Sequence, residues 1–227
     1  MGEVLGSLLP HAFGISLSPI PIMGFLLMLT STGGRAKAWS FIAGAYICLF
    51  GLAVITSMVA SAPEDIDENN SDASNSAAWI RIGLGLLLFF FAYRQWKKLP
   101  GEGEVAEVPG WMKAIDKMSA VQAFGMGALL MGPKPKNLII IIGASLNVAE
   151  AGLRTSTQWI TNAIFILLAL WILILLALMP LLLGHRGDKL LTQVSTVLGR
   201  YNGVVMLVIF MAIGVVFLGN GISALFD

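Results

Sequence analysis

The sequence contains a single cysteine, Cys48, and two histidines, His11 and His185, which lie far apart along the chain. One cysteine excludes disulfides within the chain, thiol relays and cysteine-based metal sites. The two histidines flank different apolar runs, so we predict no metal site and no cofactor. The sequence also lacks a phosphate-binding loop, which argues against ATP as the direct energy source.

Charged residues are scarce as well: they make up 12% of the 227 residues, and the formal net charge is +1. Contact with nucleic-acid phosphates needs a basic face, so we expect no nucleic-acid partner. Hydrophobic residues account for 57% of the chain, which is more apolar surface than a soluble domain of this length can bury. The composition therefore predicts an all-α integral membrane protein.

Membrane-spanning helices need roughly 20 mostly apolar residues. The segments that qualify are residues 4–29, 39–60, 79–93, 120–146, 159–183 and 203–226, which gives six predicted spans. Ten basic residues lie in the first, third and fifth connections, whereas the other connections hold two, Arg81 and Arg154. This bias predicts a multi-pass protein of the bacterial plasma membrane with its basic connections in the cytoplasm and both termini outside.

A Pro-x-Pro motif interrupts two of the predicted spans near their middle. SPIPI, at residues 18–22, breaks the first span, and GPKPK, at residues 132–136, breaks the fourth, 114 residues further along. Each proline pair is expected to end one half-helix and to begin the next. The second half-helix would then point its free N–H groups and positive dipole end at the break.

The two breaks lie in corresponding positions of two halves of the chain. We therefore predict three-helix repeats at residues 1–98 and 119–227, joined by a cytoplasmic linker at 99–118 that includes an amphipathic helix. Because three spans reverse the direction of entry, the second repeat is inverted. In transporters with inverted repeats, substrate sites lie near the midplane at such broken helices.

The lysines at the second break predict a site for an anionic group. A charge that deep in the membrane costs roughly 2.5–3.5 kcal/mol, and no Asp or Glu lies inside a predicted span to pair with it. The candidate substrate-binding residues are Ser16, Ser18, Pro19, Pro21, Lys134, Pro135, Lys136 and Asn137. The alternative is that the prolines are packing kinks and the lysines extend to an interface.

Three weaker patterns add smaller predictions. Residues 110–118 and 188–200 have the spacing of short amphipathic helices lying on the inner leaflet. The GISL stretch near His11 lacks an oriented acid, so we predict no catalytic residue and no enzyme. Close helix approach is expected at four glycines, namely Gly83, Gly85, Gly214 and Gly219.

Several stretches together resemble a known family. They are LSPIPI, GRAKAWSFIAG, AYRQWKKLP, VPGWMKAIDKMS, GPKPKNLIIIIGA, GHRGDKLL and GISAL. The chain is similar, over nearly its whole length, to the GAP family of actinobacterial membrane proteins (glycopeptidolipid- and sulfolipid-addressing proteins), within the superfamily of LysE-type exporters. The fourth span of that family usually carries an Asn-Pro-Lys-Asn-Leu core. Residues 135–138 match this core, while Lys134 stands where asparagine is common.

The resemblance implies a secondary transporter or flippase that exports an anionic lipid or glycolipid across the plasma membrane. The headgroup would bind at the midplane between the two broken helices, and membrane lipids would be the partners; a homodimer is left open. Two alternatives remain: an exporter of a small soluble solute, such as an amino acid or another small anion, and a non-transporting scaffold for cell-envelope lipid assembly. Two costly intramembrane lysines argue against the scaffold.

Overall fold

A computed structural model describes residues 2–60, 70–97, 115, 117–183 and 185–226, and these residues form helices and turns with no strand among them. In chain order the helices are α1 (Gly2–Ser16), α2 (Pro19–Thr30), α3 (Gly34–Ala60), α4 (Asn70–Trp96), α5 (Ala120–Met131), α6 (Pro135–Glu150), α7 (Thr155–Ala169), α8 (Trp171–Leu183) and α9 (His185–Phe226). The all-helical prediction is confirmed for this part of the chain.

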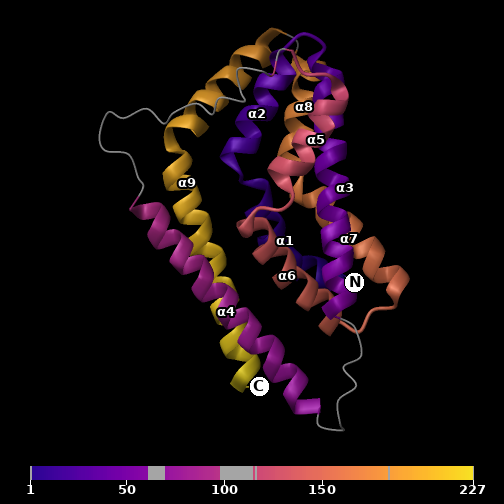
Figure 1. The fold of residues 1–227 in the computed structure, drawn as a ribbon, viewed down its shortest axis with the longest axis vertical. Helices are drawn as coiled ribbons and strands as arrows, with labels where there is room; N and C mark the ends of the chain where they lie inside the picture. The colour runs from indigo at the N-terminus through magenta and orange to yellow at the C-terminus, as the bar shows by residue number, and fades with distance from the viewer. Residues whose placement is uncertain (1, 61–69, 98–114, 116, 184, 227) are drawn as a thin grey trace.

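The chain runs back and forth along the long axis of the molecule (Figure 1). It reverses direction after α2, α3, α4, α6 and α8, whereas α1 continues into α2, α5 into α6, and α7 into α8. The marked N and C ends both lie in the lower half of the view. Helices α4 and α9 pack along each other as an antiparallel pair, and the remaining helices form a second group beside them.

Within the described part of the chain, three helices are long and apolar enough to cross a membrane: Gly34–Ala60, Ala77–Trp96 and Gly203–Leu225. The described residues contain up to five such spans if each of two bent pairs is one span. The pair α1–α2 bends by 65°, and α7 bends by 54° against residues 171–180 of α8. These helices indicate a multi-pass membrane protein. Helix α5 is apolar but has only 12 residues, so the six-span architecture stays a prediction.

Helix ends are marked by local sequence signals. Ser119 and Gln122 form a capping box at the start of α5: the Gln122 N–H donates to the Ser119 hydroxyl at 3.2 Å, and the Ser119 N–H donates to the Gln122 side chain at 2.9 Å. Gly33 and Gly152 have φ angles of 70° and 58° in the turns before α3 and after α6. Other residues adopt this left-handed region only at a cost, so glycine suits both turns.

The third and fifth predicted spans differ from the structure. Helix α4 begins at Asn70, whereas the prediction began at residue 79, because a count of apolar residues misses a helix that continues into a polar segment. Arg81, which we placed in a connection, is buried inside α4. The fifth span is interrupted at Leu170, although no proline stands at that position.

The two predicted amphipathic helices have different outcomes. Residues 188–200 are helical, but they continue into the last apolar segment as part of α9, so the prediction of a separate short helix is wrong. No proline divides α9, so the helix can continue from one segment into the next. Of residues 110–118, and of the linker predicted at 99–118, only residues 115, 117 and 118 lie within the described part.

Two of the four predicted glycines bring α4 and α9 close together. A Cβ added at Gly85 would lie 3.1 Å from the carbonyl oxygen of Gly214, and a Cβ added at Gly214 would lie 3.4 Å from the carbonyl oxygen of Gly85. The prediction is confirmed for this pair. It is wrong for Gly83 and Gly219, where an added Cβ would meet nothing within 4 Å.

A second close approach, which the sequence analysis did not single out, joins α3 to α5. A Cβ added at Gly44 would collide with the backbone carbonyl of Phe124, and one added at Gly127 would collide with the backbone carbonyl of Phe41. The contact is therefore reciprocal and made by backbone. In lipid, where helices gain nothing by hiding apolar side chains from each other, such small-residue contacts bring helices together.

Buried hydroxyls and amides also connect α3 to its neighbours. Thr56 is hydrogen-bonded to Ser145 of α6 at 2.5 Å, and the Asn162 amide of α7 donates to the Ser57 hydroxyl at 3.1 Å. Ser57, Ser145 and Asn162 are buried. Hydrogen bonds of this kind contribute to helix association in membranes, by about 0.6 kcal/mol on average.

Replacing Asn162 with alanine is expected to lower the melting temperature (Tm) only slightly, because the Ser57 hydroxyl can turn to a carbonyl of its own helix. A double-mutant cycle with Ser57→Ala, measured from melting curves in detergent, should give a coupling energy of about 0.6 kcal/mol. A coupling energy above ~2 kcal/mol would show that this bond belongs to a larger network.

Candidate functional site at the two helix breaks

The first break separates α1 from α2. Helix α1 ends at Ser16 and α2 begins at Pro19, so Leu17 and Ser18 form the break. Ser18 is the N-cap residue with an extended backbone, and its side chain makes no capping hydrogen bond. The prediction that a proline opens the second half-helix is confirmed here.

The second break separates α5 from α6 and is one residue longer. Helix α5 ends at Met131 and α6 begins at Pro135, with Lys134 as an extended N-cap residue that makes no side-chain capping bond. Pro19 and Pro135 therefore occupy the same position in their helices. The motifs SPIPI and GPKPK pair Pro19 with Pro133 in the sequence. The structure instead pairs Pro19 with Pro135, two residues later.

The two half-helices present different numbers of amide donors to their breaks. The first three N–H groups of a helix have no intrahelical acceptor, and proline has no N–H at all. Helix α2 has proline at its first and third positions, which leaves the Ile20 amide. Helix α6 has proline only at its first position, which leaves the amides of Lys136 and Asn137. The start of α6 is therefore the better site for an anion.

Lys136 joins the two breaks. Its ammonium donates to the Gly14 carbonyl and to the Ser18 hydroxyl, each at 2.7 Å, and more weakly to the Leu17 carbonyl at 3.5 Å. The Ser18 hydroxyl donates in turn to the Ile15 carbonyl at 2.8 Å. A cation at the C-terminal end of α1 is also favoured by the helix dipole. Lys136 is only 5% exposed. Its hydrogen bonds to Gly14 and Ser18 form a joint between the two helix breaks.

Asn137 ties α6 back to α5. Its side-chain N–H donates to the Met131 carbonyl, the last of α5. The residue is fully buried, and its side-chain oxygen has no hydrogen-bond partner within the described part of the chain. Asn137 therefore fixes the geometry of the second break and leaves a buried acceptor there.

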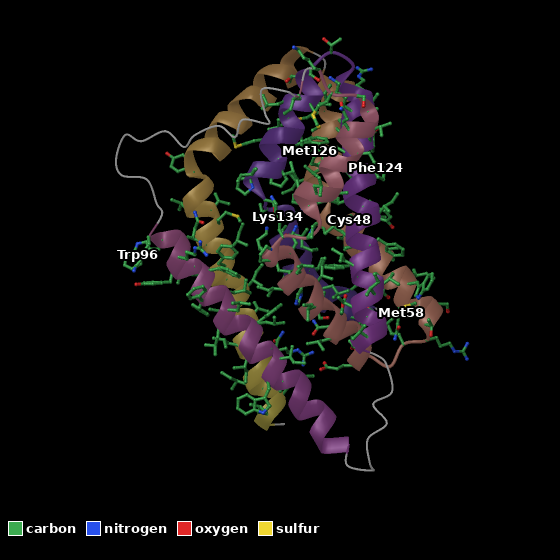
Figure 2. All side chains as sticks on the ribbon, in the orientation of Figure 1. Cys48, Met58, Trp96, Phe124, Met126 and Lys134 are labelled. Carbon is green, nitrogen blue, oxygen red and sulfur yellow. The ribbon has the colours of Figure 1, made fainter. Side chains whose placement is uncertain are left out.

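Lys134 differs from Lys136. Figure 2 labels it near mid-height of the molecule, at the break between α5 and α6, with Cys48 of α3 at about the same level. Lys134 is half-buried, and its side chain makes no hydrogen bond or ion pair with the residues that the structure describes. Lys136 lies two residues further along the chain, and the two ammonium groups repel each other. Lys134 is thus a partly buried cation beside the amides at the start of α6.

The structure brings some of the candidate residues together. Ser18 and Lys136 meet directly, and Pro19 and Pro135 begin the two half-helices at the breaks. The Ser16 hydroxyl instead donates to the Phe13 carbonyl of its own helix at 2.9 Å. Substrate binding by any of the candidate residues stays a prediction.

A polar cluster that sequence reasoning missed lies near the other end of α6. The Arg81 guanidinium of α4 donates to the Asn147 side chain at 3.0 Å and forms an ion pair with Glu150. The Asn147 amide in turn reaches the Ser7 hydroxyl of α1 at 3.5 Å. The sequence analysis places Arg81 in a connection, and Glu150 lies beyond the predicted span at 120–146. The available signal was that Arg81 follows Trp79 inside an apolar run.

Comparison with family models identifies the chain. The model described as "Sap, sulfolipid-1-addressing protein" matches residues 8–223, a range that contains both helix breaks. The chain belongs to this family. No curated protein and no solved structure matches it. Membership of the sulfolipid-1-addressing family is consistent with the predicted GAP-type resemblance and indicates a lipid-related function at a membrane.

Proposed function

We propose that the chain is a secondary transporter or flippase that exports an anionic lipid or glycolipid across the plasma membrane. The observation that carries the proposal is the half-buried ammonium of Lys134 at the start of α6, which has no hydrogen bond or ion pair among the described residues. An unpaired charge inside a membrane is costly, and an anionic headgroup would compensate it. The family description, which names a sulfolipid, supports a lipid substrate.

The proposed architecture is the inverted pair of three-helix repeats at residues 1–98 and 119–227, which makes six membrane crossings. Its support is a pattern of exchanged partners: α3 packs on α5 as α7 packs on α1, and α2 contacts α9 as α6 contacts α4. A twofold axis in the membrane plane would relate each contact to its counterpart. We place the basic connections in the cytoplasm and both termini outside; the link to LysE-type exporters stays a prediction.

The two lysines have separate roles in this proposal. The Lys136 ammonium holds the two half-helices together through Gly14 and Ser18. The Lys134 ammonium and the amides of Lys136 and Asn137 receive the anionic group. This division makes Lys134 the residue to test, because removing its charge breaks no hydrogen bond among the described residues.

Lys134→Gln should lower the binding of anionic lipid while leaving the protein folded. Native mass spectrometry of nanodisc-reconstituted protein would count retained phosphatidylglycerol relative to phosphatidylcholine. We expect about a tenfold loss of preference for phosphatidylglycerol, the size of one charge-assisted hydrogen bond. The matched control is Lys117→Gln, which removes an exposed lysine away from the break and should leave the preference unchanged.

An unchanged preference in Lys134→Gln would contradict the proposed site. Transport itself is tested in proteoliposomes with fluorescent phosphatidylglycerol and, separately, with a radiolabelled amino acid. Lipid translocation that Lys134→Gln reduces supports the proposal. Amino-acid flux without lipid translocation would favour the small-solute exporter, and the absence of both fluxes would favour the scaffold.

A further inference from the structure

We propose that Arg81 forms a second anion-binding position, near the opposite end of α6 from Lys134. At this position an oxyanion of the substrate headgroup (a phosphate, sulfate or carboxylate) would displace Glu150 from the guanidinium. The inference rests on the proposed function, because it gives a translocated headgroup a second contact after Lys134.

Arg81 is a buried cation within a helix that is apolar enough to cross a membrane, Ala77–Trp96. A charged residue in such a segment is costly and is a functional candidate by default. Its guanidinium is held by the Asn147 side chain at 3.0 Å and by the Glu150 carboxylate. Residues 201–226, the apolar part of the neighbouring α9, contain no charged side chain, so this part of α9 supplies no competing carboxylate.

The two ends of this ion pair are unequally buried. The Arg81 side chain is 8% exposed, whereas the Glu150 side chain is 47% exposed. Glu150 is also the last residue of α6, so its carboxylate can turn to solvent while the guanidinium stays in place. Water can hydrate the exposed carboxylate when it leaves the guanidinium, so Glu150 loses less on separation than the buried Arg81 does. We therefore expect the Glu150 carboxylate to be able to leave the Arg81 guanidinium.

A guanidinium is well suited to receive the headgroup in place of Glu150. Its planar fork of N–H donors matches two oxygens of a phosphate, sulfate or carboxylate at once. Exchange of one anion for another keeps the buried charge compensated, which avoids the large cost of leaving Arg81 unpaired. The Asn147 amide would keep the fork oriented throughout the exchange.

The position of Arg81 relative to Lys134 fits a route along α6. From Pro135 to Asn147 the helix rises roughly 18 Å at 1.5 Å per residue, somewhat more than half of a hydrocarbon core about 30 Å thick. Arg81 belongs to the α4–α9 pair and Asn147 to the second group of helices. An anion at Arg81 would therefore lie between the α4–α9 pair and the second group of helices, further along α6 from the break at Lys134.

The test uses two variants that break the same ion pair but are expected to act in opposite directions. Glu150→Gln removes the competing charge and should raise phosphatidylglycerol retention several-fold, whereas Arg81→Gln should lower it about tenfold. Native mass spectrometry would compare both in the wild-type and Lys134→Gln backgrounds. Arg154→Gln, which removes an exposed arginine close to Glu150 in the sequence, is the control and should change nothing.

If the pair only holds helices together, both variants lose the same contact and retention changes in the same direction, or not at all. Either result overturns the inference. Where Arg81→Gln fails to yield folded protein, Arg81→Lys keeps the charge without the fork and should retain an intermediate amount of lipid; retention equal to wild type would also overturn the inference. Failure of the Lys134 site is read separately, from Lys134→Gln with Arg81 and Glu150 intact.

Discussion

A Lys136→Met protein is expected to melt about 5–15 °C below the wild type, because the side chain holds both helix breaks together. Methionine fills a similar volume but leaves the Gly14 carbonyl and the Ser18 hydroxyl without the donor that now lies 2.7 Å from each. Each buried group that loses its partner costs about 1–3 kcal/mol. In hydrocarbon no water replaces the missing donor.

The matched control is Lys134→Met, the same substitution two residues earlier. The Lys134 side chain makes no hydrogen bond or ion pair within the described residues, and its charge is costly inside a membrane, so the Tm of this variant should equal or exceed that of the wild type. The Tm is measured on detergent-purified protein by heating samples and following the loss of the monodisperse peak in size-exclusion chromatography. Equal melting temperatures for Lys136→Met and the wild type would show that the inter-break bonds contribute nothing to stability.

Gly127→Leu is expected to prevent the protein from folding. The new side chain would have to occupy the place of the Phe41 backbone carbonyl on α3, and a backbone atom cannot turn aside as a side chain can. The milder Gly127→Ala should fold with a destabilisation of about 1–3 kcal/mol, typical of overpacking. The yield of monodisperse protein after membrane extraction would rank the two variants.

Gly125→Leu provides the control on the same helix. An added Cβ at Gly125 meets nothing within 4 Å, so a leucine side chain can extend into open space there. Its yield should match that of the wild type. If Gly127→Leu and Gly125→Leu were recovered equally well, the close packing of α3 on α5 would not occur in the membrane.

The two helix breaks could be predicted because their cause is local. Proline lacks an N–H and fits the first turn of a helix, and Pro19 and Pro135 open their half-helices in this way. Single prolines are a weaker signal, because Pro10 and Pro180 lie inside α1 and α8. The charge at the second break was also visible, as was its need for compensation. The predicted spans contain no carboxylate to supply that compensation, and Lys136 takes it instead from carbonyl and hydroxyl oxygens at the first break.

Contacts between distant segments could not be predicted in this way. The Arg81–Glu150 pair depends on how α4 lies against α6, and nothing in the local sequence of either residue indicates the other. Glycines show the same limit, because Gly85 and Gly127 lie at helix crossings while Gly83 and Gly125 face open space. Gly83 and Gly85 are two residues apart, as are Gly125 and Gly127. The sequence therefore does not show which glycine of each pair lies at a helix crossing.

The joint at Lys136 has a consequence for the relation between the two halves of the chain. The first half supplies acceptors, the Gly14 carbonyl and the Ser18 hydroxyl, and the second half supplies the cation that binds them. Two copies of the first half would bring acceptors together without a donor, and two copies of the second would set ammonium groups against each other. The halves are therefore not interchangeable: the acceptors of one are satisfied only when it packs against the other.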